Sequence, residues 1–188
     1  ENPGTIAGIT YDTTVYKVVV TVEDDGNGQL NGTTTYYKSD SDGKFSEPPE
    51  KTDNIATFTN TYTAEPAKVT LTARKSLDVK VGTRELQANE FSFELCDANG
   101  TVVSTATNAA DGTVTFEPLS FDANAVGKQT YIIREVTNGT LGGITYDTNK
   151  YEVSFSIPDN GKGQLEASTP VYKLNGEGED VGGAEFVN

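Results

Sequence analysis

Histidine, tryptophan and methionine are absent from the 188 residues of the chain, and cysteine occurs once, as Cys96. Because a single cysteine has no partner within the chain, an internal disulfide is excluded. The lack of histidine also excludes a Cys-His nucleophile and a zinc site. We therefore expect no metal and no cofactor, and interpret Cys96 as an incidental thiol. If the protein is extracellular, it must be stabilised without disulfide bonds.

Positive charge and long apolar runs are also scarce. The chain has 14 lysine and arginine residues against 28 aspartate and glutamate residues, so its formal net charge is −14 at pH 7. Such a charge argues against a nucleic-acid partner or an anionic membrane surface. The longest apolar runs are only a few residues, too short to span a membrane. Neither a signal peptide nor a sorting tail is present, and we interpret the chain as a mature fragment or a slice of a longer protein.

The residues that are abundant are typical of an all-β protein. Threonine, glycine, tyrosine and valine are frequent, and turn dipeptides such as Asn99-Gly100 and Asp111-Gly112 recur. A single helical turn is expected near residues 123–125. Alternation and turn residues in the second part of the chain predict strands near 68–77, 90–96, 101–106, 112–117, 129–136, 150–157, 164–173 and 183–188.

The strongest internal signal is a repeat. Residues 8–30 and 143–165 align without a gap at an offset of 135, with 13 of 23 positions identical. Both copies begin with the sequence GITYDT, and both end in a Phe-x-Asn strand, at residues 58–60 and 186–188. The chain is therefore a tandem array.

The two copies are not equally complete. The second, residues 67–188, has the size of an immunoglobulin-like sandwich. The first, residues 1–66, matches only the C-terminal half of the second. Half a sandwich exposes an apolar face and should not be stable alone. We therefore expect the missing half either upstream of residue 1 or on another polypeptide.

Three polar residues of the second copy share the parity of the apolar residues in their strands: Lys75, Glu135 and Asn188. An unpaired buried ammonium is costly, so an inward Lys75 must be paired, neutralised or chemically consumed. Taken alone, the strand pattern favours a Lys75 near a strand end, with its amine extended to water. Together, the three residues predict a buried polar cluster whose members satisfy one another.

Two other chemical interpretations are weaker. Residues 23–28 (EDDGNG) crowd carboxylates around a glycine turn, as calcium loops do. Their repeat partner, residues 158–163 (PDNGKG), keeps the turn but loses most of the charge, so a hairpin turn explains both copies. A glycosidase would need two carboxylates at a recognisable spacing, and none is tied to one.

Several ordered motifs resemble the pilin isopeptide-linkage domain family, which occurs in backbone pilins and surface adhesins of Gram-positive bacteria. The resemblance covers residues 68–188, and residues 1–62 match the C-terminal half of the family pattern. The motifs are AxKxL (73–77), EFSFEL (90–95), TNAADGTVTFEPLSF (107–121), YIIREV (131–136), GITYDT (143–148) and EFVN (185–188). The resemblance implies tandem immunoglobulin-like (CnaB-type) β-sandwich domains.

The resemblance also implies a spontaneous amide bond between Lys75 of the first strand and Asn188 of the last, promoted by a buried Glu135. Burial disfavours the charged forms of both lysine and glutamate, which would leave a neutral amine to attack the carboxamide carbon. We expect Glu135 to donate to the carboxamide oxygen and to pass a proton to the departing ammonia. Lys68 and Lys80 are competing donors, but their parity is opposite to that of the apolar face.

In the first copy the same alignment gives Asn60 as the acceptor. It gives Glu1 as the acid if one residue is deleted. The corresponding lysine would lie upstream of this chain.

These features predict a structural stalk domain of a Gram-positive cell-surface pilus or adhesin. We expect self-modification rather than turnover, so the protein is not an enzyme. The expected partners are other pilin subunits or neighbouring domains, with no nucleic acid and no membrane insertion. The alternative is an adhesive module that binds a host glycan or protein through its loops, of which the acidic loop 39–53 is the first candidate. A hydrolase with paired carboxylates is a third possibility.

Overall fold

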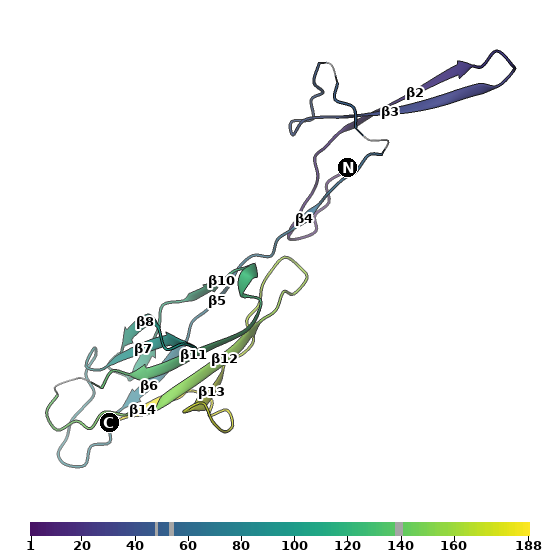
Figure 1. Cartoon of the computed structure of the whole chain (residues 1–188). Coiled ribbons are helices and arrows are strands. Elements are labelled where there is room, and N and C mark those ends of the chain that lie inside the picture. Colours follow the sequence, from purple (N-terminus) through teal and green to yellow (C-terminus); the bar gives the residue numbers. More distant parts are fainter. Residues whose placement is uncertain (48, 53–54, 138–140) are drawn as a thin grey trace. The chain divides into compact units, whose positions relative to one another are not determined.

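Strands make up nearly all of the regular structure in the computed structural model, which describes residues 1–47, 49–52, 55–137 and 141–188. The chain divides into two units, Glu1–Thr63 and Ala64–Asn188, each described here by itself (Figure 1). The expected helical turn is confirmed as a 3-10 turn, Ala123–Ala125, where the Asp122 carboxylate accepts from the backbone N–H of Asn124. In the described part of the chain, no helix is long and apolar enough to cross a membrane.

The larger layer of the second unit is a five-stranded antiparallel sheet. Its strand order is β13-β12-β11-β7-β8. The residues of β12 alternate between the two faces of the sheet, so every second side chain faces the core and is buried. The strands are β7 (Ser92–Asp97), β8 (Val102–Thr107), β11 (Gly127–Glu135), β12 (Lys150–Ile157) and β13 (Val171–Leu174).

The opposing layer brings β14, the last strand of the unit, beside β6, the second of the two strands (β5 and β6) that occupy the predicted strand 68–77. Strand β14 pairs in parallel with β6, and Phe186 lies opposite Lys75. Strand β9 pairs with the other edge of β6, and β10 pairs with β5. The strands of this layer are β5 (Ala67–Val69), β6 (Thr72–Ser76), β9 (Thr113–Thr115), β10 (Leu119–Phe121) and β14 (Ala184–Val187).

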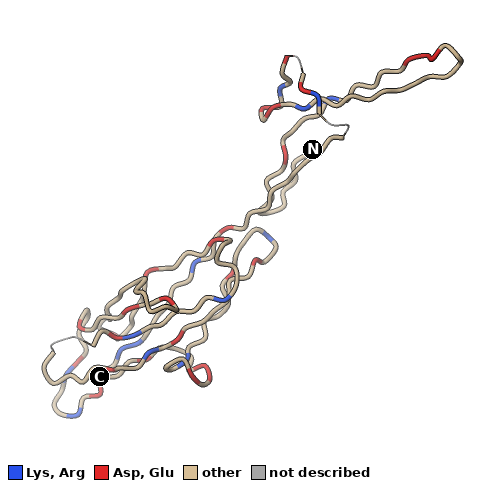
Figure 2. Tube along the Cα trace, viewed as in Figure 1, with Lys and Arg blue, Asp and Glu red and all other residues tan. Residues whose placement is uncertain are grey.

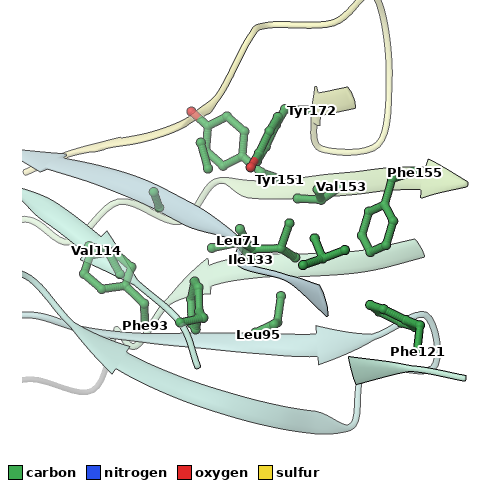
Figure 3. Close-up of a cluster of buried hydrophobic side chains, with 14 of the residues drawn as sticks. Leu71, Phe93, Leu95, Val114, Phe121, Ile133, Tyr151, Val153, Phe155 and Tyr172 are labelled. Atoms are coloured by element: carbon green, nitrogen blue, oxygen red, sulfur yellow. The ribbon is translucent and has the colours of Figure 1, made fainter. Parts of the chain in front are cut away.

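The core of the second unit lies between these two layers. Side chains from both layers lie together in Figure 3: Leu71 and Val114 come from the smaller layer, and Phe93, Ile133 and Val153 come from the five-stranded sheet. All five are at most 1% exposed. Burial of each large apolar side chain contributes roughly 1.5–3 kcal/mol, so the second unit has a substantial core without disulfides. This confirms the all-β, immunoglobulin-like fold.

One predicted strand is shorter than expected. The prediction ran over residues 164–173, whereas β13 covers only Val171–Leu174. Pro170 precedes β13 and has no N–H to donate to a ladder. The first copy has Thr35 at the equivalent position, and there the corresponding strand β3 (Leu30–Lys38) is continuous.

The first unit consists of two ladders. The hairpin of β2 (Tyr16–Asp24) and β3 is one, and the short pair β1 (Ile9–Thr10) and β4 (Thr61–Tyr62) is the other. Val18, Val20 and Val22 of β2 are 49%, 63% and 57% exposed. Their equivalents in β12, which are Val153, Phe155 and Ile157, are 0%, 3% and 0% exposed. The apolar face of the β2–β3 hairpin is therefore uncovered in the described residues.

Charged residues are spread over both units, with acidic residues in the majority (Figure 2). The acidic residues at the end of β2 belong to the hairpin turn. There, the Asp25 carboxylate accepts hydrogen bonds from the backbone of Asn27 and Gln29. These hydrogen bonds stabilise the hairpin turn, so a turn explains the calcium-like sequence of residues 23–28. Of the acidic loop 39–53, residues 48 and 53 lie outside the described part of the chain.

Candidate functional site

Lys75 points into the core from β6. Its inward direction follows from the alternation of the strand, in which Ala73 and Lys75 are buried and their neighbours are exposed. The residue is 1% exposed, so its amine does not extend to water. The Nζ atom lies 3.0 Å from Oε2 of Glu135 and 4.7 Å from the centre of the Phe91 ring. The Glu135 carboxylate favours the cationic form of Lys75 through its negative charge, and the Phe91 ring favours it through its π face.

The electrostatic balance at Lys75 is set mainly by burial. Burial lowers the pKa of the Lys75 amine below its ordinary value of 10.5. The hydrogen bond and the charge of Glu135 act in the opposite direction, as does the charge of Asp147. The net effect is a lowered pKa, which makes the neutral, nucleophilic form of this amine more accessible than that of a surface lysine.

Glu135, at the end of β11, connects the other two residues. Its side chain is fully buried, and its two oxygens have different partners. Oε2 accepts from Lys75 Nζ at 3.0 Å, and Oε1 accepts from Asn188 Nδ2 at 2.7 Å. The carboxylate therefore holds the amine and the carboxamide on its two sides. All buried side-chain polar atoms in the described residues have a hydrogen-bond partner.

Asn188 follows β14, and three backbone hydrogen bonds hold it in place. Its own N–H donates to the carbonyl of Ser76, and its carbonyl accepts from the N–H of Asp78. Its side-chain oxygen Oδ1 accepts from the backbone N–H of Asp147 at 2.7 Å. Because an N–H group can bond only to the oxygen of a carboxamide, this last contact fixes which way the side chain faces.

The facing of the Asn188 carboxamide corrects one sequence-based expectation. We expected Glu135 to donate to the carboxamide oxygen, but in the structure Glu135 contacts the carboxamide nitrogen. The physical reason is that the N–H of Asp147 already occupies the oxygen. Once Glu135 has taken up a proton, its carboxyl group is well placed to protonate the departing ammonia, and the oxygen has a separate donor.

The competing lysines lie on the surface. Lys80 has a side chain that is 79% exposed and forms an ion pair with Asp78. Lys68 is an exposed residue of β5. Cys96 is buried on a strand of the five-stranded sheet, and burial raises the pKa of its thiol, which keeps it protonated and unreactive.

The structure also brings Glu1 and Asn60 together. Asn60 Nδ2 donates to Glu1 Oε1 at 3.0 Å, and Asn60 Oδ1 accepts from the backbone N–H of Asp12 at 2.8 Å. These contacts match those of Asn188 with Glu135 and Asp147. In contrast to the second unit, the residues here are exposed. At the offset of 135, no residue of this sequence corresponds to Lys75.

Asp147 was missed as a site residue from the sequence. The available signal was the GITYDT motif, which occurs in both copies and places Asp12 and Asp147 at equivalent positions. A groove of about 970 Å³ borders the site, and its walls include Asp147, Tyr151 and Asn188. This groove gives the carboxamide end of the site access to solvent.

The two-layer fold, in which β6 and β14 run parallel, defines the class of the protein, an immunoglobulin-like β-sandwich domain. Comparison with family models identifies the particular family. The chain belongs to the FctA family of Spy0128-like isopeptide-containing domains, whose model matches residues 1–63 and 71–188. This is a family of structural pilin domains, which generally link to other pilin subunits, so the match supports a structural role in a pilus. Comparison with curated proteins found no match.

Proposed function

We propose that the protein is a stalk domain of a Gram-positive cell-surface pilus or adhesin, stabilised by an intramolecular isopeptide bond between Lys75 and Asn188. The observation that supports this proposal best is the buried carboxylate of Glu135, which contacts the amine on one side and the carboxamide on the other. Its partners in the pilus are other pilin subunits or neighbouring domains of the same chain.

The reaction begins with transfer of a proton from Lys75 to Glu135, which leaves a neutral amine. Nζ attacks Cγ of Asn188, and the C–N bond that forms gives a tetrahedral intermediate. Glu135 delivers its proton to Nδ2 and takes one of the two protons on Nζ, which leaves the single N–H of the product amide. The bond between Cγ and Nδ2 then breaks, and ammonia leaves. The amine and carboxamide thus become one secondary amide and one ammonia.

Proximity lowers the barrier of this reaction. The fold holds both reacting side chains against the Glu135 carboxylate, and well-oriented intramolecular reactions gain about 7–11 kcal/mol of the barrier from such placement. No external catalyst is needed, and the reaction occurs once per molecule. The chain is therefore its own substrate and not an enzyme.

The consequence of the bond is mechanical. It closes a loop of 113 residues (188 − 75) and joins two parallel neighbouring strands, β6 and β14. A cross-link over a loop of this size stabilises a fold by about 4–5 kcal/mol in the chain-entropy model. Tension between the first and last strands passes through a covalent bond that, unlike a disulfide, does not respond to redox conditions.

We also propose that residues 67–188 are a complete domain and residues 1–66 the C-terminal half of another. The exposed valines of β2 support this division, because their equivalents in β12 are covered by the opposing layer. In the first domain, Asn60 is the acceptor and Glu1 the acid. The lysine is supplied upstream or by another polypeptide.

Intact mass spectrometry of the folded chain tests the cross-link. The expected mass is below that of the sequence by one ammonia, and Lys75→Ala restores the full mass. Lys68→Ala and Lys80→Ala are matched controls that keep the loss, because neither amine reaches Glu135. The full mass in the folded wild-type chain, or a loss that disappears in either control, contradicts the assignment.

A further inference from the structure

The carboxamide oxygen of Asn188 has a hydrogen-bond donor with no role in the proton transfers of the proposed cross-linking reaction. It accepts from the backbone N–H of Asp147 at 2.7 Å, within the range expected for a short N–H···O bond. When an amine attacks a carboxamide, negative charge develops on this oxygen. A donor already in position stabilises that charge better than mobile water does, because it needs no reorganisation as the charge develops.

The other polar groups of the site are committed elsewhere. Oε2 of Glu135 contacts the attacking amine and Oε1 contacts the leaving nitrogen. Asp147 is therefore the group that the structure places against the oxygen.

The side chain of Asp147 fixes the position of its own backbone. Oδ2 accepts from the backbone N–H of Val187 at 3.0 Å, and Oδ1 accepts from that of Asn149 at 2.9 Å. Asp147 thus holds the residue before Asn188 through its carboxylate and the Asn188 side chain through its amide. These contacts join the 144–149 loop to the end of β14 and keep the acceptor still.

The first unit repeats this arrangement without a surrounding core. The backbone N–H of Asp12 donates to Asn60 Oδ1 at 2.8 Å. The Asp12 carboxylate accepts from the backbones of Thr59 and Thr14, both at 2.8 Å. The hydrogen bond with the Thr14 side chain, followed by these two backbone hydrogen bonds, lowers the pKa of Asp12 to about 2. Because the same three bonds form where these residues are not covered by a core, burial in a core is not required for them.

We propose that the backbone N–H of Asp147 stabilises the oxyanion that forms on Asn188, and that the Asp147 carboxylate is a positioning residue for this amide. This inference rests on the proposed cross-link between Lys75 and Asn188. In the intermediate, the electron pair of the C–O π bond moves onto Oδ1 and is held by the Asp147 N–H. It returns to re-form the carbonyl as ammonia leaves, so the amide gives up no proton.

The carboxylate of Asp147 does not activate the amine. Its charge raises the pKa of Lys75, which favours the unreactive ammonium form. Replacement of Asp147 therefore has two opposite effects on the reaction rate. It loosens the acceptor, which slows the reaction, and it makes the Lys75 amine easier to deprotonate, which speeds it. A net slower reaction identifies positioning as the dominant contribution.

The decisive experiment removes the N–H and leaves the side chain. The full chain is synthesised in a cell-free system with the α-hydroxy analogue of aspartate at position 147, which replaces the amide N–H by an ester oxygen. Samples are quenched in denaturant at intervals, and intact mass gives the fraction that has lost ammonia. Removal of one oxyanion donor is expected to slow the reaction about 10²–10³-fold.

An ester at position 144 is the matched control. The N–H of Ile144 donates to the carbonyl of Leu141 within the same segment and not to Asn188, so this ester is expected to leave the rate close to that of wild type. Equal rates for the esters at 147 and 144 overturn the inference. They leave the proposed function intact if the wild-type chain still loses ammonia through Lys75. A wild-type chain that never loses ammonia overturns both.

Side-chain variants provide a test that does not depend on the ester. Asp147→Asn keeps one acceptor and Asp147→Ala keeps none, so we expect the rate to fall from wild type to Asn to Ala. The folded fraction of each variant is measured in a Lys75→Ala background, where no bond forms. Rates that match wild type after correction for this fraction show that the carboxylate is merely structural and contradict its positioning role.

Discussion

Replacement of Asn188 by alanine should remove the cross-link and keep the buried ion pair of Lys75 and Glu135. The loss of a covalent link over 113 residues (188 − 75) costs about 4–5 kcal/mol in the chain-entropy model. The N–H of Asp147 also loses its acceptor, which adds about 1–3 kcal/mol where the group stays away from water. The second unit is therefore expected to lose about 5–8 kcal/mol of stability in this variant.

Thermal unfolding measures this loss. For domains of this size, each kcal/mol shifts Tm by about 2–6 °C, so the transition of the second unit should fall by at least about 10 °C. A double variant with Lys75→Met separates the covalent bond from the lost side chains. Each single substitution already removes the bond, so the double variant should be more stable than additivity predicts, by about 4–5 kcal/mol. A Tm that falls by only a few degrees in Asn188→Ala, with additive substitutions, would refute the reasoning.

Three further predictions follow from the same contacts. Glu135→Ala should fold but keep its full mass, because no group then moves protons between the amine and the leaving nitrogen; a cross-linked Glu135→Ala chain would show that this role is wrong. In the uncross-linked Asn188→Ala variant, the lowered pKa of Lys75 means that the unfolded chain binds more protons between the folded pKa and 10.5. Its denaturant-measured stability should therefore rise with pH through that window, relative to the double variant with Lys75→Met, and equal slopes would contradict this. Phe155→Ala should cost the second unit about 3–5 kcal/mol of stability. The equivalent substitution Val20→Ala, on an uncovered face, should change stability by no more than about 0.5 kcal/mol. Similar losses for both variants in chemical denaturation would show that this face is covered.

Much of the second unit could be predicted from the period of its strands. Alternation places Lys75, Glu135 and Asn188 on core-facing positions, and all three meet in the structure. Period two is informative here because each of these residues lies in or next to a regular strand between two layers. The family motifs then supply the chemistry that alternation alone leaves open.

Other features of the site and the fold could not be read from alternation. Which way the Asn188 carboxamide faces depends on a backbone N–H in the 144–149 loop, and loop amides have no sequence period. Strand β13 starts only after Pro170, which has no N–H to donate to the ladder. This is a local effect within an otherwise regular pattern. The repeat contained the first of these signals, since Asp12 and Asp147 occupy the same position in both copies.

The most direct test of the central claim is the identification of the joined peptides. Trypsin cleaves after Arg74, Lys80 and Lys173, so the bond should link residues 75–80 to residues 174–188 in one branched peptide. We predict that this branched peptide is present in digests of the folded chain and is one ammonia lighter than the sum of its two parts. Its fragment ions should place the linkage between Lys75 and Asn188. Recovery of residues 174–188 only as a free, unmodified peptide would contradict the account.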